Sequence, residues 1–147
     1  MLKNLLVAGL AGLTVTACDL PKDPEHTTSE VRGGVLRAGL LRGADTERDQ
    51  AIVRRLAQQL DAEAEFQTGE AHQLVRAVER GDIHVIGGGL PAATPFKSHL
   101  GLSRPAGRLS GSPEGSKRVL AVRAGENGFL VELNRAIAAE TAAGGGS

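Results

Sequence analysis

The sequence predicts an α/β fold in which helices cover both faces of a mainly parallel sheet, giving three layers. The first observation is order, because short apolar runs alternate with segments of helical period as strand, helix, strand, helix, strand. The second is Ile83–Gly87, a largely apolar run typical of a strand buried on both faces. The third is one more strand and helix near the end of the chain. This order implies right-handed crossovers between parallel strands.

The first strand and the first helix are expected in the segment that begins at residue 34. Gly34–Leu41, GVLRAGLL, is a short apolar run and predicts a strand. Asp45–Leu60 predicts a helix, with Thr46 as its N-cap and Asp49 three residues on, in the spacing of a capping box. The apolar positions of this helix recur at helical spacing: Ile52, Val53, Leu56, Ala57 and Leu60.

The later elements are shorter. They are expected as a strand at Ala64–Thr68, a helix at Ala71–Arg80, a strand at Ile83–Gly87, a strand at Arg118–Arg123 and a helix at Asn127–Ala139. Gly81 ends the second helix, since glycine adopts the left-handed conformation that closes many helices. The last helix is expected to face inward through Phe129, Leu130, Leu133 and Ile137.

The first 17 residues, MLKNLLVAGLAGLTVTA, predict a secretory signal peptide. Lys3 precedes an apolar run of 11 residues, Leu5–Val15, whereas a membrane span needs about 20. The alternative is a buried N-terminal helix, which Gly9 and Gly12 disfavour.

The next residues resemble a bacterial lipobox. In Val15-Thr16-Ala17-Cys18 the cysteine would become the first mature residue and carry acyl chains, which anchor a protein stably to a membrane. Cys18 is the only cysteine, so no internal disulfide is expected. Asp19 resembles an inner-membrane retention signal. The alternative for Cys18 is a free thiol beside an ordinary cleavage site.

Four segments are therefore expected. Residues 1–17 are the lipoprotein signal peptide, and residues 18–32, polar with two prolines, are a tether between lipid and domain. Residues 33–141 form one domain, and the small-residue segment 142–147 is a flexible tail. This architecture locates the protein in the cell envelope, on the periplasmic face of the inner membrane or the outer face of the cell membrane.

Composition and motifs exclude several classes of function. The chain has 17 basic and 17 acidic residues, with no Trp and no Tyr, so nucleic-acid binding lacks both charge and stacking platforms. No phosphate-binding loop, dinucleotide fingerprint or nucleophile elbow is present. We therefore expect no enzyme, no cofactor and no metal. His84 is expected to be an ordinary core or surface histidine.

Three ordered segments carry a family resemblance: GVLRAGLL, RRLAQQLDAEAEF and LVRAVERGDIHVIGG. Together they resemble the first lobe of the bacterial extracellular solute-binding proteins that feed amino acids and similar solutes to importers. That family continues with Thr-x-x-Arg and Phe-Ser-x-Pro-Tyr. Here Thr94 and Lys97 take the first two positions, and Leu102-Ser103 and Pro105-Ala106 take the second set. Several residues depart from the pattern, notably Lys97 for arginine and Ala106 for the aromatic ring.

The second lobe of that family is missing from this chain. The later segment RVLAVRAGENGFLVELNRAI resembles the return to the first lobe, and only Gly107–Lys117, GRLSGSPEGSK, lies before it. The resemblance covers Gly33–Thr141 and implies a single lobe, with this Gly/Ser/Pro-rich segment as a surface loop. An unrelated small α/β domain is the alternative.

The resemblance implies a binding site in the loop after the third strand, Gly87–Gly107. Relatives hold a ligand carboxylate there with backbone N–H groups, hydroxyls and an arginine. The corresponding residues here are Gly88, Gly89, Thr94, Lys97, Ser103 and Arg104. Lys97 has the positional claim to the anion, and Arg104 is the alternative. The segment could also be only a connector with Lys97 solvated.

The function implied is weak binding of a small solute, with carboxylates as candidates, or assistance to a transporter. Expected partners are a solute, a transporter permease or a second copy, and the membrane through the lipid. The alternative is an interaction module that has lost ligand binding and docks another envelope protein or its own copy. A cleft lined by polar groups favours the solute, and an apolar patch of several hundred Å² favours the partner.

Overall fold

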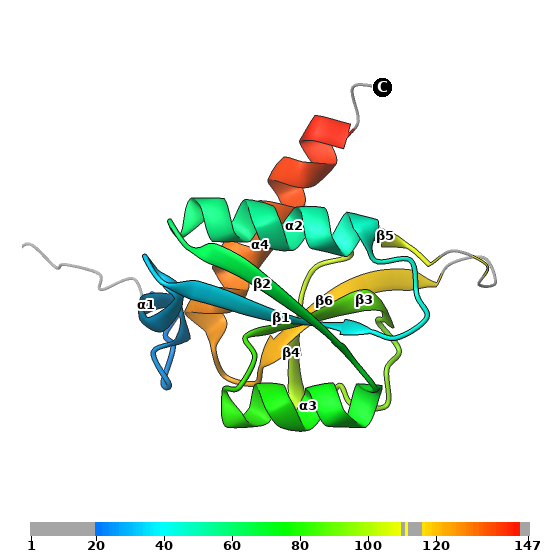
Figure 1. Ribbon diagram of the computed structural model, residues 1–147, viewed down its shortest axis with the longest axis horizontal. Coiled ribbons are helices and arrows are strands. Elements are labelled where there is room, and N and C mark those ends of the chain that lie inside the picture. The colour runs from blue at the N-terminus through cyan, green and yellow to red at the C-terminus, as the bar shows by residue number, and fades with distance from the viewer. Residues whose placement is uncertain (1–19, 110, 112–115, 145–147) are drawn as a thin grey trace, which may run out of the picture.

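The computed structural model describes residues 20–109, 111 and 116–144, which form one sheet with helices on both faces (Figure 1). The elements in order are α1 (Thr27–Val31), β1 (Val35–Leu41), α2 (Glu47–Gln59), β2 (Glu63–Gly69), α3 (Ala71–Arg80), β3 (Val85–Pro91), β4 (Leu100–Leu102), β5 (Gly107–Arg108), β6 (Lys117–Arg123) and α4 (Asn127–Gly144). The three-layer α/β prediction is confirmed, with α2 and α4 on one face and α3 on the other.

The strand order is β2-β1-β3-β6-β4, and β5 also pairs with β6. β1 runs parallel to β2 and to β3, whereas β6 is antiparallel to β3, β4 and β5. Every strand except β6 thus points the same way, so the sheet is mostly parallel. The carboxyl ends of β1 and β3 meet at one end of it.

Two hydrophobic cores lie on the two faces of the sheet, and β6 contributes to both. Leu120 and Val122 belong to the core under α2 and α4, and Val119 and Ala121 belong to the core under α3. All four are at most 2% exposed. This alternation follows from the two-residue period of a strand, and it explains why RVLAVR is apolar at four successive positions.

Helix α2 begins as the sequence predicts, but its expected capping box does not form. The Thr46 side chain caps no backbone N–H, and its hydroxyl accepts a hydrogen bond from the Gln50 side-chain amide at 2.9 Å. Asp49 turns away from the helix terminus and is fully buried. The local spacing was right for a cap, but distant partners take the Asp49 carboxylate.

The third strand is longer than expected, and Gly87–Gly107 is not a single loop. β3 continues to Pro91 through an irregularity in its pairing with β6 between Ile86 and Leu90. Gly88 and Gly89 lie at that point with φ of +90° and +80°, a conformation that favours glycine. β4 and the first residue of β5 also fall within the expected loop.

The expected tether also differs from the structure, because residues 22–32 pack against the lobe. α1 lies in this segment, and Val31 is fully buried in the core under α2 and α4. The folded unit therefore begins well before residue 33. At the other end α4 runs to Gly144, past the expected domain boundary at residue 141. Of the helices in the described part of the chain, none is long and apolar enough to span a bilayer.

Candidate functional site

A hollow of about 440 Å³ opens where the carboxyl ends of β1 and β3 meet the β5–β6 hairpin. A wider hollow of about 610 Å³ adjoins it and shares Asp45 and Arg118. We call the two together the candidate cleft. Its lining residues are Gly43, Ala44, Asp45, Glu47, Arg48, Ala51, Gly89, Pro91, Gly107, Arg108, Leu109, Ser116, Arg118 and Glu140. Ligands of open α/β sheets bind at this end of the strands.

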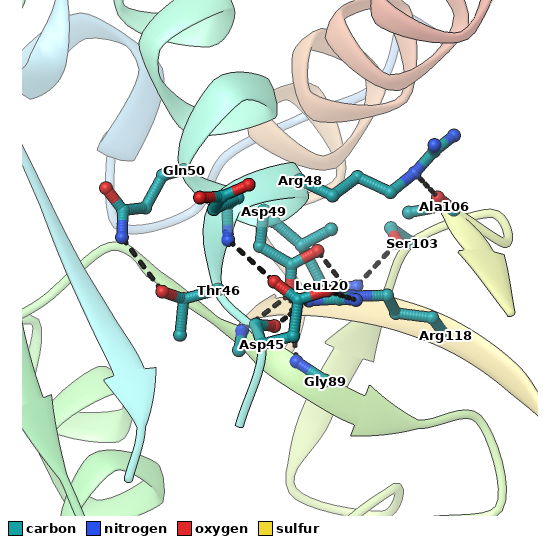
Figure 2. A network of polar contacts seen from close by, with 12 residues as sticks. Asp45, Thr46, Arg48, Asp49, Gln50, Gly89, Ser103, Ala106, Arg118 and Leu120 are labelled. Carbon is teal, nitrogen blue, oxygen red and sulfur yellow. Dashed lines mark hydrogen bonds and ion pairs between the residues drawn. The ribbon is translucent and has the colours of Figure 1, made fainter. Parts of the chain in front are cut away.

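A buried ion pair forms the floor of the candidate cleft (Figure 2). The Arg118 Nε–H of β6 donates to Asp49 Oδ1 of α2 at 2.8 Å, and the two side chains are 3% and 0% exposed. Asp49 Oδ2 accepts the Gly88 and Gly89 backbone N–H groups at 2.5 and 3.0 Å. One carboxylate therefore joins α2, β3 and β6. Its charge is neutralised within the protein.

The rim carries charges that are open to solvent. Arg118 also donates to the Asp45 carbonyl oxygen, and its Nη1 lies 3.9 Å from Asp45 Oδ2. The Asp45 side chain is 56% exposed. Because Asp49 already balances Arg118, Asp45 leaves an excess negative charge among the described residues that line the smaller hollow. The chemistry of this rim suits a cationic group better than an anion.

The wider hollow carries both signs of charge. Arg48 donates from Nε to the Ala106 carbonyl oxygen, which ties α2 to the chain before β5 (Figure 2). Glu140 of α4 pairs with Arg55 at 2.7 Å, and both are partly buried. Arg108 is exposed at the edge. A solute in this hollow would meet separate positive and negative groups.

The sequence predicted that Gly88 and Gly89 would present their amides to a ligand. In the structure both amides donate to Asp49 instead. Packing within the protein also requires glycine at residue 88, because a Cβ on Gly88 would lie 2.6 Å from the Leu41 backbone nitrogen. The sequence predicted close backbone approach to a ligand, whereas in the structure these glycines approach the neighbouring strand β1 and the buried Asp49 carboxylate.

Thr94 and Lys97 lie on the α3 side of the sheet and do not line the candidate cleft. Thr94 is 2% exposed, and its hydroxyl accepts the Phe96 backbone N–H at 3.3 Å. The Phe96 ring packs edge-on against His72 at 4.8 Å between ring centroids. Lys97 is exposed on the same turn.

Ser103 and Arg104 lie elsewhere, against β6 and α4. The Ser103 hydroxyl accepts the Leu120 N–H at 2.9 Å and donates to the Arg104 carbonyl at 2.7 Å. The Arg104 N–H donates to Asn134 Oδ1 at 2.8 Å. The structure therefore distributes the six predicted residues over three places and does not assemble them into one site.

His84 is buried at the opposite end of the sheet from the candidate cleft. Its Nδ1 accepts the Arg37 backbone N–H at 3.0 Å, and its Nε2 lies 3.1 Å from Arg37 Nη2 and 3.4 Å from Glu30 Oε1. Burial lowers the pKa of His84 below its ordinary value, and the Arg37 guanidinium lowers it further, while Glu30 opposes both. The described residues contain no group of three or more potential ligands that could hold a metal ion.

Sequence reasoning missed Asp45, Asp49 and Arg118 as residues of the site. The sequence predicts Asp49 only as the residue three positions after the N-cap Thr46, and Arg118 only as the first residue of a strand. The available signal was an arginine directly next to four apolar strand residues, since a charge in such a position usually needs a partner.

No protein-family model matches the sequence, and no curated protein sequence matches it. Solved structures do match. The arginine-bound form of domain 1 of TmArgBP is 20% identical with a TM-score of 0.62, covering 78% of this chain and 97% of that chain. An ancestral cationic amino acid solute-binding protein is 12% identical with a TM-score of 0.65, covering 81% and 95%.

The substrate-binding protein of an amino acid ABC transporter is also similar, at 12% identity and a TM-score of 0.59, covering 76% of this chain and 95% of that chain. At these identities the likeness establishes the fold. The chain has the fold of a single lobe of an amino-acid solute-binding protein, as the resemblance in its sequence implies.

Proposed function

We propose that this lobe binds a small amino-acid-type solute weakly in the candidate cleft, with Asp45 holding the cationic group. The observation that carries the proposal is the charge balance of the cleft floor, where Asp49 neutralises Arg118 and Asp45 remains exposed beside them. The arginine-bound domain 1 of TmArgBP supports it, because a single lobe of similar fold is found there with a small cationic amino acid. The proposal moves the expected site from Lys97 to Asp45.

The affinity should be low because the cleft is open. A two-lobed protein closes over its ligand and removes it from water, whereas an exposed ion pair contributes only about 0–1 kcal/mol. Asp45 and a few backbone groups should therefore give a dissociation constant on the order of 0.1–10 mM, or about 3–5 kcal/mol. Tight binding would need a second surface from a permease or from another copy.

The test is an NMR titration of the monomer with arginine, lysine, alanine and glutamate. We expect the two cationic amino acids to bind most strongly and Asp45→Asn to abolish their binding. Glu65→Gln is the matched control, since it removes one exposed carboxylate on β2 that does not line the candidate cleft. Loss of binding in Lys97→Ala instead would return the site to the α3 side. Submicromolar binding by a proven monomer would refute the open-cleft argument.

Anchoring through Cys18 is the second part of the proposal. Cys18 lies outside the described residues, and the support is the sequence Val15-Thr16-Ala17-Cys18. Intact-mass measurement of membrane-extracted protein should find an acylated Cys18 at the N-terminus, and Cys18→Ser should release the lobe or block its processing. A soluble native product that retains Met1 would contradict it.

The surface favours a solute over an apolar docking partner. Over the ranges that the structure describes, Leu20 is the one large hydrophobic side chain that is strongly exposed, at 78%. A docking face of several hundred Å² would need a cluster of such residues. The polar, charged cleft is therefore the better candidate for function.

A further inference from the structure

The segment Lys22–Arg32 is bound to the lobe at the end of the sheet opposite the candidate cleft. Figure 1 shows α1 at one end of the long axis and the β5–β6 hairpin at the other. The two prolines and the polar composition of residues 18–32 predicted a tether between lipid and domain here. The contacts of this segment, called the N-terminal strut below, indicate a different role.

Glu126 holds the middle of the strut. This carboxylate, just before α4, is 1% exposed. Its two oxygens accept the backbone N–H groups of Glu25 at 2.9 Å and of Thr27 at 3.0 Å. Charged acceptors of backbone N–H groups make stronger hydrogen bonds than neutral ones, and the burial of Glu126 protects them from water.

Asp23 fixes the start of the strut to the N-terminus of α4. Its Oδ1 accepts the Phe129 N–H at 2.8 Å, and its Oδ2 accepts from both the backbone and the hydroxyl of Thr28. The Lys22 carbonyl accepts the Asn127 N–H at 3.0 Å. Any side chain at residue 128 would collide with Asp23, since a Cβ on Gly128 would lie 2.9 Å from its Oδ1.

The end of the strut enters the core. Val31 is fully buried among residues of α2 and α4, and Glu30 pairs with Arg37 at 3.2 Å. The Gly33 N–H donates to the Leu60 carbonyl at 2.9 Å. A helix of five residues such as α1 is not stable alone, so these tertiary contacts hold it in place. A flexible tether would not need these contacts.

We propose that the N-terminal strut orients the lobe on a lipid surface, with the α1 end toward the bilayer and the candidate cleft away from it. This rests on the proposed anchoring at Cys18. Five residue steps separate Cys18 from Asp23, so even a fully extended chain places Asp23 within about 17 Å of the anchor. Because Asp23 is fixed to α4, the short distance from the anchor keeps the α1 end of the lobe near the membrane. This constraint sets the orientation of the whole lobe. The cleft then receives its solute or partner from the aqueous side.

The composition of the chain permits a direct test. The chain has one cysteine and no tryptophan, so Cys18 can be coupled to a maleimide lipid while one introduced tryptophan reports position. Among the described residues, every buried hydrophobic side chain lies between Val31 and Ile137, so a chain that starts at Cys18 keeps this core. Ser29→Trp reports from exposed α1, and Lys117→Trp reports from the exposed hairpin.

Vesicles containing nitroxide-headgroup lipids should quench the tryptophan at residue 29 several-fold more than the one at residue 117. The double variant Asp23→Ala, Glu126→Ala should make the quenching at residues 29 and 117 nearly equal. The control variant Glu65→Ala should leave the difference in quenching unchanged. Equal quenching in the unaltered strut would overturn the proposal, as would an unchanged difference after Asp23 and Glu126 are replaced.

A second measurement covers the case in which the double variant does not fold. Hydrogen exchange on the unaltered protein should find the Glu25 and Thr27 amides protected, and free exchange at both would overturn the strut. Because the lipid is coupled to Cys18 chemically, these results do not depend on whether the host acylates Cys18. The intact-mass measurement tests that acylation separately.

Discussion

Replacing Asp49 by asparagine tests whether the floor of the candidate cleft is also a main support of the fold. The substitution keeps the shape of the side chain and one oxygen for the Gly88 and Gly89 amides. It removes the negative charge and turns an NH₂ group toward the Arg118 Nε–H, so two donors face each other 2.8 Å apart. Arg118, 3% exposed, keeps its positive charge without a carboxylate partner on Asp49.

The size of the effect follows from burial, because a surface pair of nearly equal length offers a comparison. Arg42 and Glu70 lie 2.9 Å apart but are 67% and 65% exposed, so Glu70→Gln should cost only about 0–1 kcal/mol. Removing one partner of a buried pair costs about 3–5 kcal/mol. Asp49→Asn should therefore remove a large part of a total stability of about 5–15 kcal/mol.

Urea denaturation followed by far-UV circular dichroism is the assay, since the chain has no tryptophan or tyrosine to follow by fluorescence. With a slope of about 2 kcal/mol per M, the midpoint of Asp49→Asn should fall by on the order of 2 M. Adding Arg118→Met should recover part of the loss, because it removes the unpaired buried charge. The reasoning is refuted if Asp49→Asn costs no more than Glu70→Gln, or if Arg118→Met adds a further full penalty.

The remaining predictions concern a titrating group and a loop. Because the fold lowers the pKa of His84, the unfolded chain binds its proton first, so the stability contributed at this residue is constant above about pH 7 and falls as the pH drops below about 6.5. Chemical denaturation of His84→Gln and of the parent should show that the variant loses less unfolding free energy between pH 7.5 and 5.5. An equal loss in the two proteins would contradict the lowered pKa of His84. A broad-specificity protease should cut between Arg108 and Lys117 before it cuts within Val119–Val122, which is at most 2% exposed; mass mapping of the first fragments decides, and early cuts in that strand would count against it.

Periodic patterns made the longer helices and strands predictable, whereas α1, β4 and β5 were not predicted. α3 was expected at Ala71–Arg80 and is found there, because Gly81 takes φ +80° directly after it. β6 was expected within one residue of its observed start, since its apolar run is packed on both faces. These elements depend on neighbours in sequence and on a burial pattern that can be read locally.

The polar contacts were not predictable because their partners lie far apart in sequence. Asp49 meets Arg118 at a separation of 69 residues, and Glu126 meets Thr27 at a separation of 99. Locally, Asp49 fitted the position three residues after the N-cap Thr46, and the segment around Thr27 fitted a tether. The tertiary structure overrode both interpretations, and it separated the expected site residues because β3 continues through the glycines where a loop was expected.

The antiparallel strand β6 has a consequence for how the chain is assembled. It lies between β3 and β4 although it comes last among the strands, so the sheet stays divided until Lys117–Arg123 has been synthesised. β6 must pair with both β3 and β4, which precede it in the chain. Each pairing closes a loop of chain, and the entropy lost in closing such loops slows folding. A nascent chain that ends before residue 117 can pair β2, β1 and β3 but lacks the strand that joins β3 to β4, so the native sheet is complete only after Lys117–Arg123 is available.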